Sequence, residues 1–211
     1  LSIKMEEKNV MKGSDIYDIS DDEVLELGKY LDGRSEPFHD ENEIDNFLLE
    51  NTNDKNPYMR VVAYLYKLEA ITDLSNVGEQ IAKIIQNYGR AVKDQFSDIP
   101  DPLDAVDISV KKTILTDIPR SYPFFKLSCK YLNIKPELYQ DKELVAKRIL
   151  AMASISDPVD LSYIQGNDRW MFNLFALTLQ LAEESMISVD YCEAIIYELF
   201  WRVTKKIDLN N

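Results

Sequence analysis

Apolar residues recur at intervals of three and four along most of the chain, which is the period of one face of an α-helix. The clearest pattern begins after Ser75 and continues for about six turns of helix. Gly78 and Gly89 lie inside this stretch. Close packing against a neighbouring helix would explain them, because glycine weakens an isolated helix. The apolar stripe consists of Val77, Ile81, Ile84, Ile85, Tyr88, Val92 and Phe96.

No segment alternates apolar and polar residues in the way of a half-buried strand. The sequence therefore predicts an all-α fold of about eight or nine helices. A stretch at 168–186 that is apolar nearly all round predicts a helix buried on most sides, and we expect a single irregular bundle around it. The last two helices are expected to form an antiparallel hairpin. Residues 1–211 are treated as one domain, with a weak boundary near 97–103 as the alternative.

Capping residues predict where the first helices begin and end. Ser20 followed by Glu23 has the pattern of a capping box, in which each side chain bonds the backbone N–H of the other residue. Gly33 marks the expected end of that helix. Asp40 or His39 is expected to cap a second, short helix.

Prolines mark further boundaries. Asn56 precedes Pro57 at a third expected helix start, since proline is tolerated at the first helical position. A later helix is expected to end before Pro119, and Pro119 and Pro123 to bracket a turn. The residues at 120–125 then form an aromatic-rich loop. We expect this loop to pack on the core, with an exposed contact patch as the alternative.

The charge of the chain is unevenly distributed. The sequence has 24 Lys and Arg against 37 Asp and Glu, a formal net charge of −13. Residues 13–54 hold 14 of these acids and only 2 basic residues. The acids are interpreted either as solvated faces and first turns of two helices, where negative charge suits the helix dipole, or as a surface for a basic protein partner. The candidate partner-binding residues are Asp15, Asp18, Asp21, Asp22, Glu23, Glu26, Asp40, Glu41 and Glu43.

The reactive side chains argue against an enzyme. One histidine, His39, and two cysteines cannot supply most catalytic triads or transition-metal sites. We therefore predict no catalytic residue, no metal ligand and no cofactor. The remaining enzyme hypothesis is a Mg²⁺-dependent phosphohydrolase that uses the N-terminal carboxylates at 21–26, although no matching second acidic pair is evident.

Cys129 and Cys192 lie among apolar residues of predicted helices, and we expect two buried, reduced thiols rather than a disulfide. No apolar stretch approaches the ~20 residues that a membrane-spanning helix needs, and the first residues lack the apolar core of a signal peptide. The expected location is the cytoplasm. The acidic balance also argues against a nucleic acid or an anionic membrane surface as a partner.

These observations predict a non-catalytic cytoplasmic protein that binds another protein. The most specific hypothesis is an immunity protein or antitoxin, an inhibitor that covers the functional surface of a basic partner such as a nuclease toxin. The alternative is a helical regulator or adaptor that binds a non-basic protein through apolar patches. The sequence does not indicate the oligomeric state.

Overall fold

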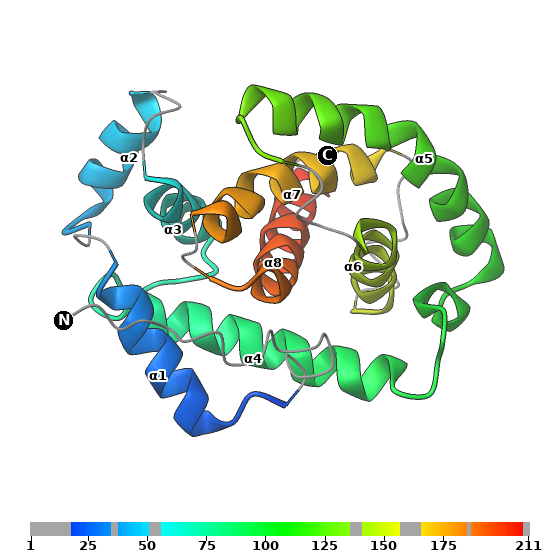
Figure 1. The fold of residues 1–211 in the computed structure, drawn as a ribbon, viewed down its shortest axis with the longest axis horizontal. Coiled ribbons are helices and arrows are strands. Elements are labelled where there is room, and N and C mark those ends of the chain that lie inside the picture. The colour runs from blue at the N-terminus through cyan, green and yellow to red at the C-terminus, as the bar shows by residue number, and fades with distance from the viewer. Residues whose placement is uncertain are drawn as a thin grey trace.

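The all-α prediction is confirmed by a computed structural model, which describes residues 18–34, 38–50, 56–135, 141–156, 166–184 and 187–208. These parts of the chain contain eight α-helices and a short 3₁₀ helix, and no strand occurs in them (Figure 1). The elements are α1 (Asp21–Asp32), α2 (Glu41–Leu49), α3 (Pro57–Lys67), α4 (Val77–Phe96), η2 (Pro102–Ala105), α5 (Ile108–Tyr131), α6 (Lys142–Ser156), α7 (Asn167–Glu183) and α8 (Val189–Asp208).

The predicted helix starts are confirmed because their capping bonds are local. Ser20 and Glu23 form the capping box, with the Ser20 N–H donating to Glu23 Oε2 at 2.8 Å. Asp40, rather than His39, caps α2, and its Oδ1 accepts the backbone N–H at position 43 at 3.0 Å. Asn56 caps α3, with proline at the first helical position.

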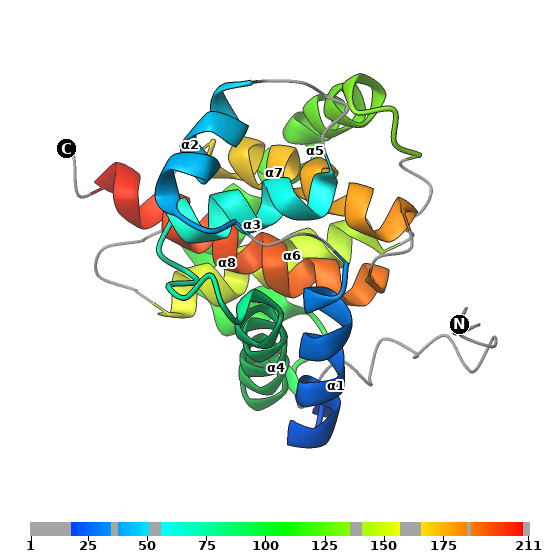
Figure 2. The same cartoon turned by 90° about the vertical axis from the view of Figure 1, so that its left-hand side faces the viewer.

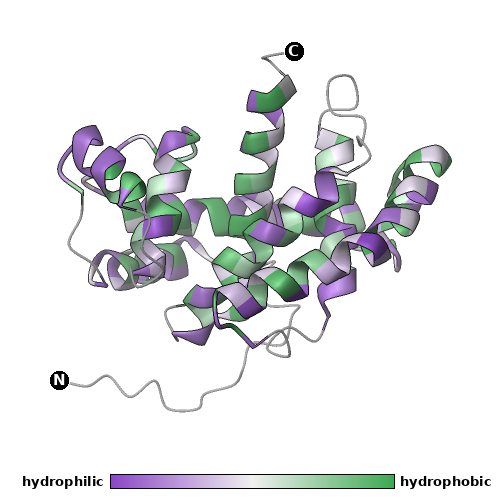
Figure 3. Ribbon diagram, turned by 90° about the horizontal axis from the view of Figure 1, so that it is seen from above, coloured by the Kyte–Doolittle hydropathy of each residue, from purple (hydrophilic) through white to green (hydrophobic). Residues whose placement is uncertain are grey.

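The helix α7 is the centre of the bundle, as predicted, and packs against α3, α5, α6 and α8. Its Phe172 and Phe175 are buried, and their ring centroids lie 5.8 Å and 5.4 Å from that of Phe125 in α5. Trp170 departs from the predicted all-round burial, since it is 56% exposed. The helices α7 and α8 pack side by side and run in opposite directions (Figure 2). The hydrophobic stretches gather on the central helices and the hydrophilic ones lie towards the outer edge (Figure 3).

The expected turn between Pro119 and Pro123 is wrong. Both prolines lie inside α5, a single helix of 24 residues that arcs around the outside of the bundle (Figure 1). Each proline removes one backbone N–H, and proline bends a helix away from its own side. Because both residues lie on the exposed face, the bend turns α5 towards the core. The segment 120–125 is therefore helical, and its Phe125 is fully buried.

The predicted close approach at Gly78 is present between α1 and α4. A methyl group placed on Gly78 would lie 2.2 Å from the carbonyl oxygen of Gly28, which is far inside van der Waals contact. Gly28 is itself tight, since an added Cβ would lie 3.0 Å from the Cα of Glu79. The two glycines therefore allow the backbones of α1 and α4 to touch. Gly89 is buried as well.

A buried ion pair joins α6 to α8. The Arg148 guanidinium donates to both carboxylate oxygens of Glu193, each at 2.5 Å, and the Tyr88 hydroxyl of α4 donates to the same carboxylate at 2.6 Å. The side chain of Glu193 is 2% exposed and that of Arg148 is 15% exposed. Such a pair is tolerated in an interior only when its hydrogen bonds are satisfied.

The predicted thiols also lie in the interior. Cys129 and Cys192 are buried and form no disulfide with each other.

Candidate functional site

The predicted partner-binding acids fall into two groups on different helices. Asp18, Asp21, Asp22, Glu23 and Glu26 belong to α1 and the turn before it, and α1 packs on α4. The other three described acids belong to α2 and its cap, and α2 packs on α3 (Figure 1). The members of this α2 group are Asp40, Glu41 and Glu43, whereas Asp15 lies outside the described residues.

Two of the α1 acids are bonded to α4. Asp18 forms an ion pair with Lys93. Asp21 accepts hydrogen bonds from Gln86 Nε2 at 2.8 Å and from Arg90 Nη2 at 3.1 Å. The hydrogen bond from Gln86, followed by the bond and the positive charge of Arg90, lowers the pKa of Asp21 below its ordinary value. These acids therefore help to hold α1 on α4.

Glu23 and the α2 acids are also engaged within the fold. The hydrogen bonds from Ser20 lower the pKa of Glu23. Glu43 accepts the backbone N–H of His39 at 2.8 Å and lies 3.1 Å from its Nδ1, and these bonds lower its pKa in turn. Asp40 caps α2, and Glu41 forms an ion pair with Lys67 at 2.7 Å. His39 thus lies at the start of α2 with a carboxylate neighbour.

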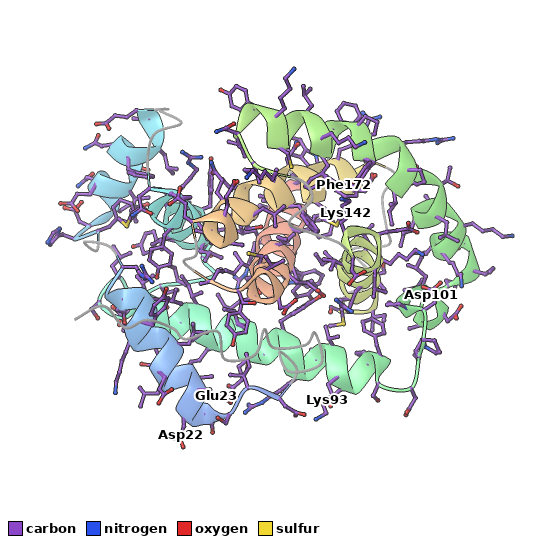
Figure 4. All side chains as sticks on the ribbon, in the orientation of Figure 1. Asp22, Glu23, Lys93, Asp101, Lys142 and Phe172 are labelled. Atoms are coloured by element: carbon purple, nitrogen blue, oxygen red, sulfur yellow. The ribbon has the colours of Figure 1, made fainter. Side chains whose placement is uncertain are left out.

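Two acids remain exposed, with no hydrogen bond or ion pair to the described residues: Asp22 and Glu26. They are one turn apart on α1, and Leu25 between them is 48% exposed. Figure 4 shows Asp22 at the outer edge of the molecule, away from Lys93. We call Asp22, Leu25 and Glu26 the α1 outer face. Sequence reasoning chose both acids, together with Glu43, as the ones to reverse in charge. It did not show that Asp18 and Asp21 are bonded to α4, because that pairing depends on helix docking.

A cavity that the sequence did not indicate lies between α5, α6 and α7, on the side where Lys142 and Phe172 lie close together in Figure 4. Its volume is about 840 Å³. Lys147 in its wall is paired with Glu143 at 3.0 Å, and Lys142 Nζ lies 5.4 Å from the centroid of the Tyr122 ring. The described lining holds no Ser, Thr, Cys or His: it consists of Pro100, Asp101, Ile118, Pro119, Tyr122, Asp141, Lys142, Glu143, Leu144, Lys147 and Phe172.

Two buried polar groups have no hydrogen-bond partner in the described structure, the Tyr58 hydroxyl and the Asp168 carboxylate. Burial, followed by the charge of Asp32, raises the pKa of Tyr58. Asp168 lies in the first turn of α7, where the helix dipole favours negative charge. Neither residue lines the cavity.

Among the residues that the structure describes, no group of three or more His, Cys, Asp or Glu side chains is arranged to hold a metal ion. Within the same ranges, no helix has the length and apolar character needed to cross a membrane. Comparison of the chain with protein-family models, with curated proteins and with solved structures finds no match.

Proposed function

We propose that the protein is a non-catalytic binding protein that neutralises a basic protein partner, in the manner of an immunity protein or antitoxin. The α1 outer face would contact this partner. The observation that carries the proposal is the difference in pairing among the acids. Asp18, Asp21 and Glu23 are bonded within the fold, whereas Asp22 and Glu26 lie exposed beside an exposed leucine.

This arrangement suits the chemistry of a protein interface. An apolar side chain at the centre can be desolvated, while charges around it stay at a solvated rim. Charges of one sign raise the association rate with an oppositely charged partner and select against others. The exposed Asp18 and Glu23 next to the face add to the negative field even though each has a partner. A reducing compartment such as the cytoplasm fits the two buried thiols.

The test compares two variants that change the net charge equally. The first is Asp22→Lys with Glu26→Lys. The matched control is Asp98→Lys with Glu184→Lys, two exposed acids after the ends of α4 and α7, where a cation suits the helix dipole. Glu43, which was in the predicted set, is left unchanged because its side chain bonds the start of α2.

Wild type and both variants are immobilised and used to capture proteins from a lysate of the source organism. We expect a basic protein to be retained by wild type and by the control and lost by the α1 variant. With that protein purified, the association rate should fall about tenfold or more in the α1 variant at low salt. The wild-type rate should also decrease as salt rises. Equal retention of the partner by the α1 variant, or a partner with acidic character, would contradict the proposal.

A further inference from the structure

The charge of α5 is opposite to that of the chain as a whole. The helix contains five basic side chains and one acid, Asp117, in a protein whose net charge is −13. Asp117 is buried. The surface that α5 presents to solvent is therefore cationic, although the chain is acidic.

An apolar strip lies on this cationic surface. Phe124, Leu127 and Tyr131 follow one another at intervals of three and four, so they share one face of the helix. This face is opposite the buried residues Phe125 and Cys129. Leu127 is 65% exposed and Tyr131 is 72% exposed, which is unusual for large apolar side chains in adjacent turns. We call Phe124, Leu127 and Tyr131 the α5 outer strip.

Cations lie on both sides of the α5 outer strip. Lys126 and Lys130 are on one flank and exposed, and Lys126 Nζ lies 5.1 Å from the centroid of the Tyr122 ring. On the other flank, Arg169 of α7 reaches over Phe124, with its guanidinium carbon 5.0 Å from the ring centroid. Arg120, one turn before Phe124, is exposed, and its guanidinium lies 3.8 Å from the buried Asp117 carboxylate.

We propose that the α5 outer strip and its flanking cations dock the protein onto an anionic membrane surface. Large apolar side chains on the lipid-facing side of a helix enter the boundary between headgroups and acyl chains, while Lys and Arg extend to the phosphates. A rim of one charge sign matches a surface that is uniformly negative. Interfaces between proteins more often carry charges of both signs, which fix how the partners are aligned. None of the exposed residues of α5 is an acid, so this surface matches a membrane better than a protein.

The separation of charge within the molecule removes the objection raised by its net charge. The two candidate acids without a partner among the described residues, Asp22 and Glu26, are on α1, which lies at the opposite edge of the molecule from α5 in both Figure 1 and Figure 2. At physiological ionic strength, charges are screened over about 8 Å. A membrane in contact with α5 would therefore encounter mainly the cations next to the strip.

Vesicle flotation with the full chain tests this proposal. The probes are phosphatidylcholine vesicles with and without about 30% phosphatidylserine. We expect binding only to the anionic vesicles, decreasing as salt is raised. Lys126→Glu with Lys130→Glu should reduce binding at least about tenfold, whereas Lys29→Glu with Lys83→Glu, an equal change of charge on α1 and α4, should retain it. Leu127→Ser should weaken binding more than Leu25→Ser does.

A labelled variant makes the test independent of how the charge variants fold. Leu127→Cys carries an environment-sensitive fluorophore, and Leu25→Cys is its control, because the two native thiols are buried. A blue shift at position 127 but not at 25 on anionic vesicles supports the proposal. Absence of binding to these vesicles, a shift at position 25 alone, or equal binding to a short DNA duplex would overturn it. The α1 variant Asp22→Lys with Glu26→Lys should still bind vesicles, so this proposal and that of a basic protein partner can fail separately.

Discussion

The Asp32 carboxylate at the end of α1 accepts a hydrogen bond from the backbone N–H of Gly78 in the first turn of α4, at 2.7 Å. The N-cap residue of α4, Asn76, makes no side-chain capping bond. A residue of α1 thus satisfies a backbone donor that an isolated α4 would leave unpaired. The same contact requires glycine at position 78, because the backbone of α1 occupies the space of a Cβ.

Gly78→Ala is therefore expected to destabilise the protein. The added methyl group would lie 2.2 Å from the Gly28 carbonyl oxygen and 2.8 Å from the Asp32 carboxyl carbon, so the two helices must move apart. We expect a loss of at least about 2 kcal/mol in the free energy of unfolding, measured by urea denaturation. Gly33→Ala is the control, since its Cβ would meet nothing closer than 3.5 Å, and it should stay within about 0.5 kcal/mol of wild type. Equal effects of the two changes would mean that α1 and α4 are not in close contact.

The buried Arg148–Glu193 pair should be costly to break from one side. Arg148→Met leaves the Glu193 carboxylate buried beside Tyr88 without its countercharge, and we expect a loss of about 3–5 kcal/mol. Arg148→Met combined with Glu193→Leu should recover part of this loss, because no buried charge is then left alone. Arg202→Met, which breaks the more exposed pair with Glu198, should cost less than about 1 kcal/mol. Denaturation curves of these three variants and of Glu193→Leu alone decide. A double variant whose loss of stability equals the sum of the losses of the two single variants would contradict the argument.

The aromatic cluster around α7 gives a further comparison within one helix. Phe172→Ala and Phe175→Ala each remove a buried ring, and each should cost about 3–5 kcal/mol because the surrounding core closes only partly over the cavity. Trp170→Ala should have a much smaller effect, since this side chain is more than half exposed. Thermal denaturation measures all three. A Trp170→Ala variant as unstable as the phenylalanine variants would show that the tryptophan is buried.

The features that the sequence predicted well are those fixed by neighbours along the chain. The bonds between Ser20 and Glu23 join residues three positions apart, so a local pattern reveals them. The continuity of α5 is different, because Pro119 and Pro123 favour a break locally. The burial of Phe125 against Phe172 and Phe175 holds the helix together across them, and such contacts are not visible in a local pattern.

The candidate site shows the same limit. Counting charges located the acidic segment, but it did not separate the acids used by the fold from those left exposed. Asp18 is paired with a residue 75 positions away in the chain, and Asp21 with one 69 positions away. The cationic surface of α5 is not evident from the net charge of −13, because acids on other parts of the chain outnumber its bases.

The two cysteines should be unreactive in the native protein. Burial raises the pKa of the Cys192 thiol to about 12, so the nucleophilic thiolate is almost absent at neutral pH. We expect a thiol reagent such as Ellman's reagent to modify neither Cys129 nor Cys192 until the protein is unfolded in guanidinium chloride, when both react. A surface variant such as Leu25→Cys provides the positive control, because its thiol is exposed. Rapid modification of the wild-type protein would show that one of these helices opens readily.

The Asp190 carboxyl group is expected to lower the stability of the folded protein as the pH rises. Asp190 is half-buried in the first turn of α8, and burial, followed by the neighbouring Glu193 charge, raises its pKa above the ordinary value of 3.8. In the unfolded chain this carboxyl ionises near pH 3.8, whereas in the folded protein it ionises only at a higher pH. Its ionisation therefore costs stability as pH rises through that interval, and the cost persists at neutral pH.

Asp190→Asn removes this ionisation with little change of shape. We expect the Tm of the variant to exceed that of wild type at pH 7, and the difference to shrink as pH falls below about 4, where wild-type Asp190 is protonated in both states. Asp21 and Glu23 act in the opposite direction, because their pKa values are lowered in the fold and their contribution is lost on acidification. The comparison must therefore be the difference between variant and wild type at each pH. Asp98→Asn, at an exposed position, should leave Tm nearly unchanged throughout. A variant that is less stable than wild type at pH 7 would mean that the helix dipole of α8 outweighs the burial of Asp190.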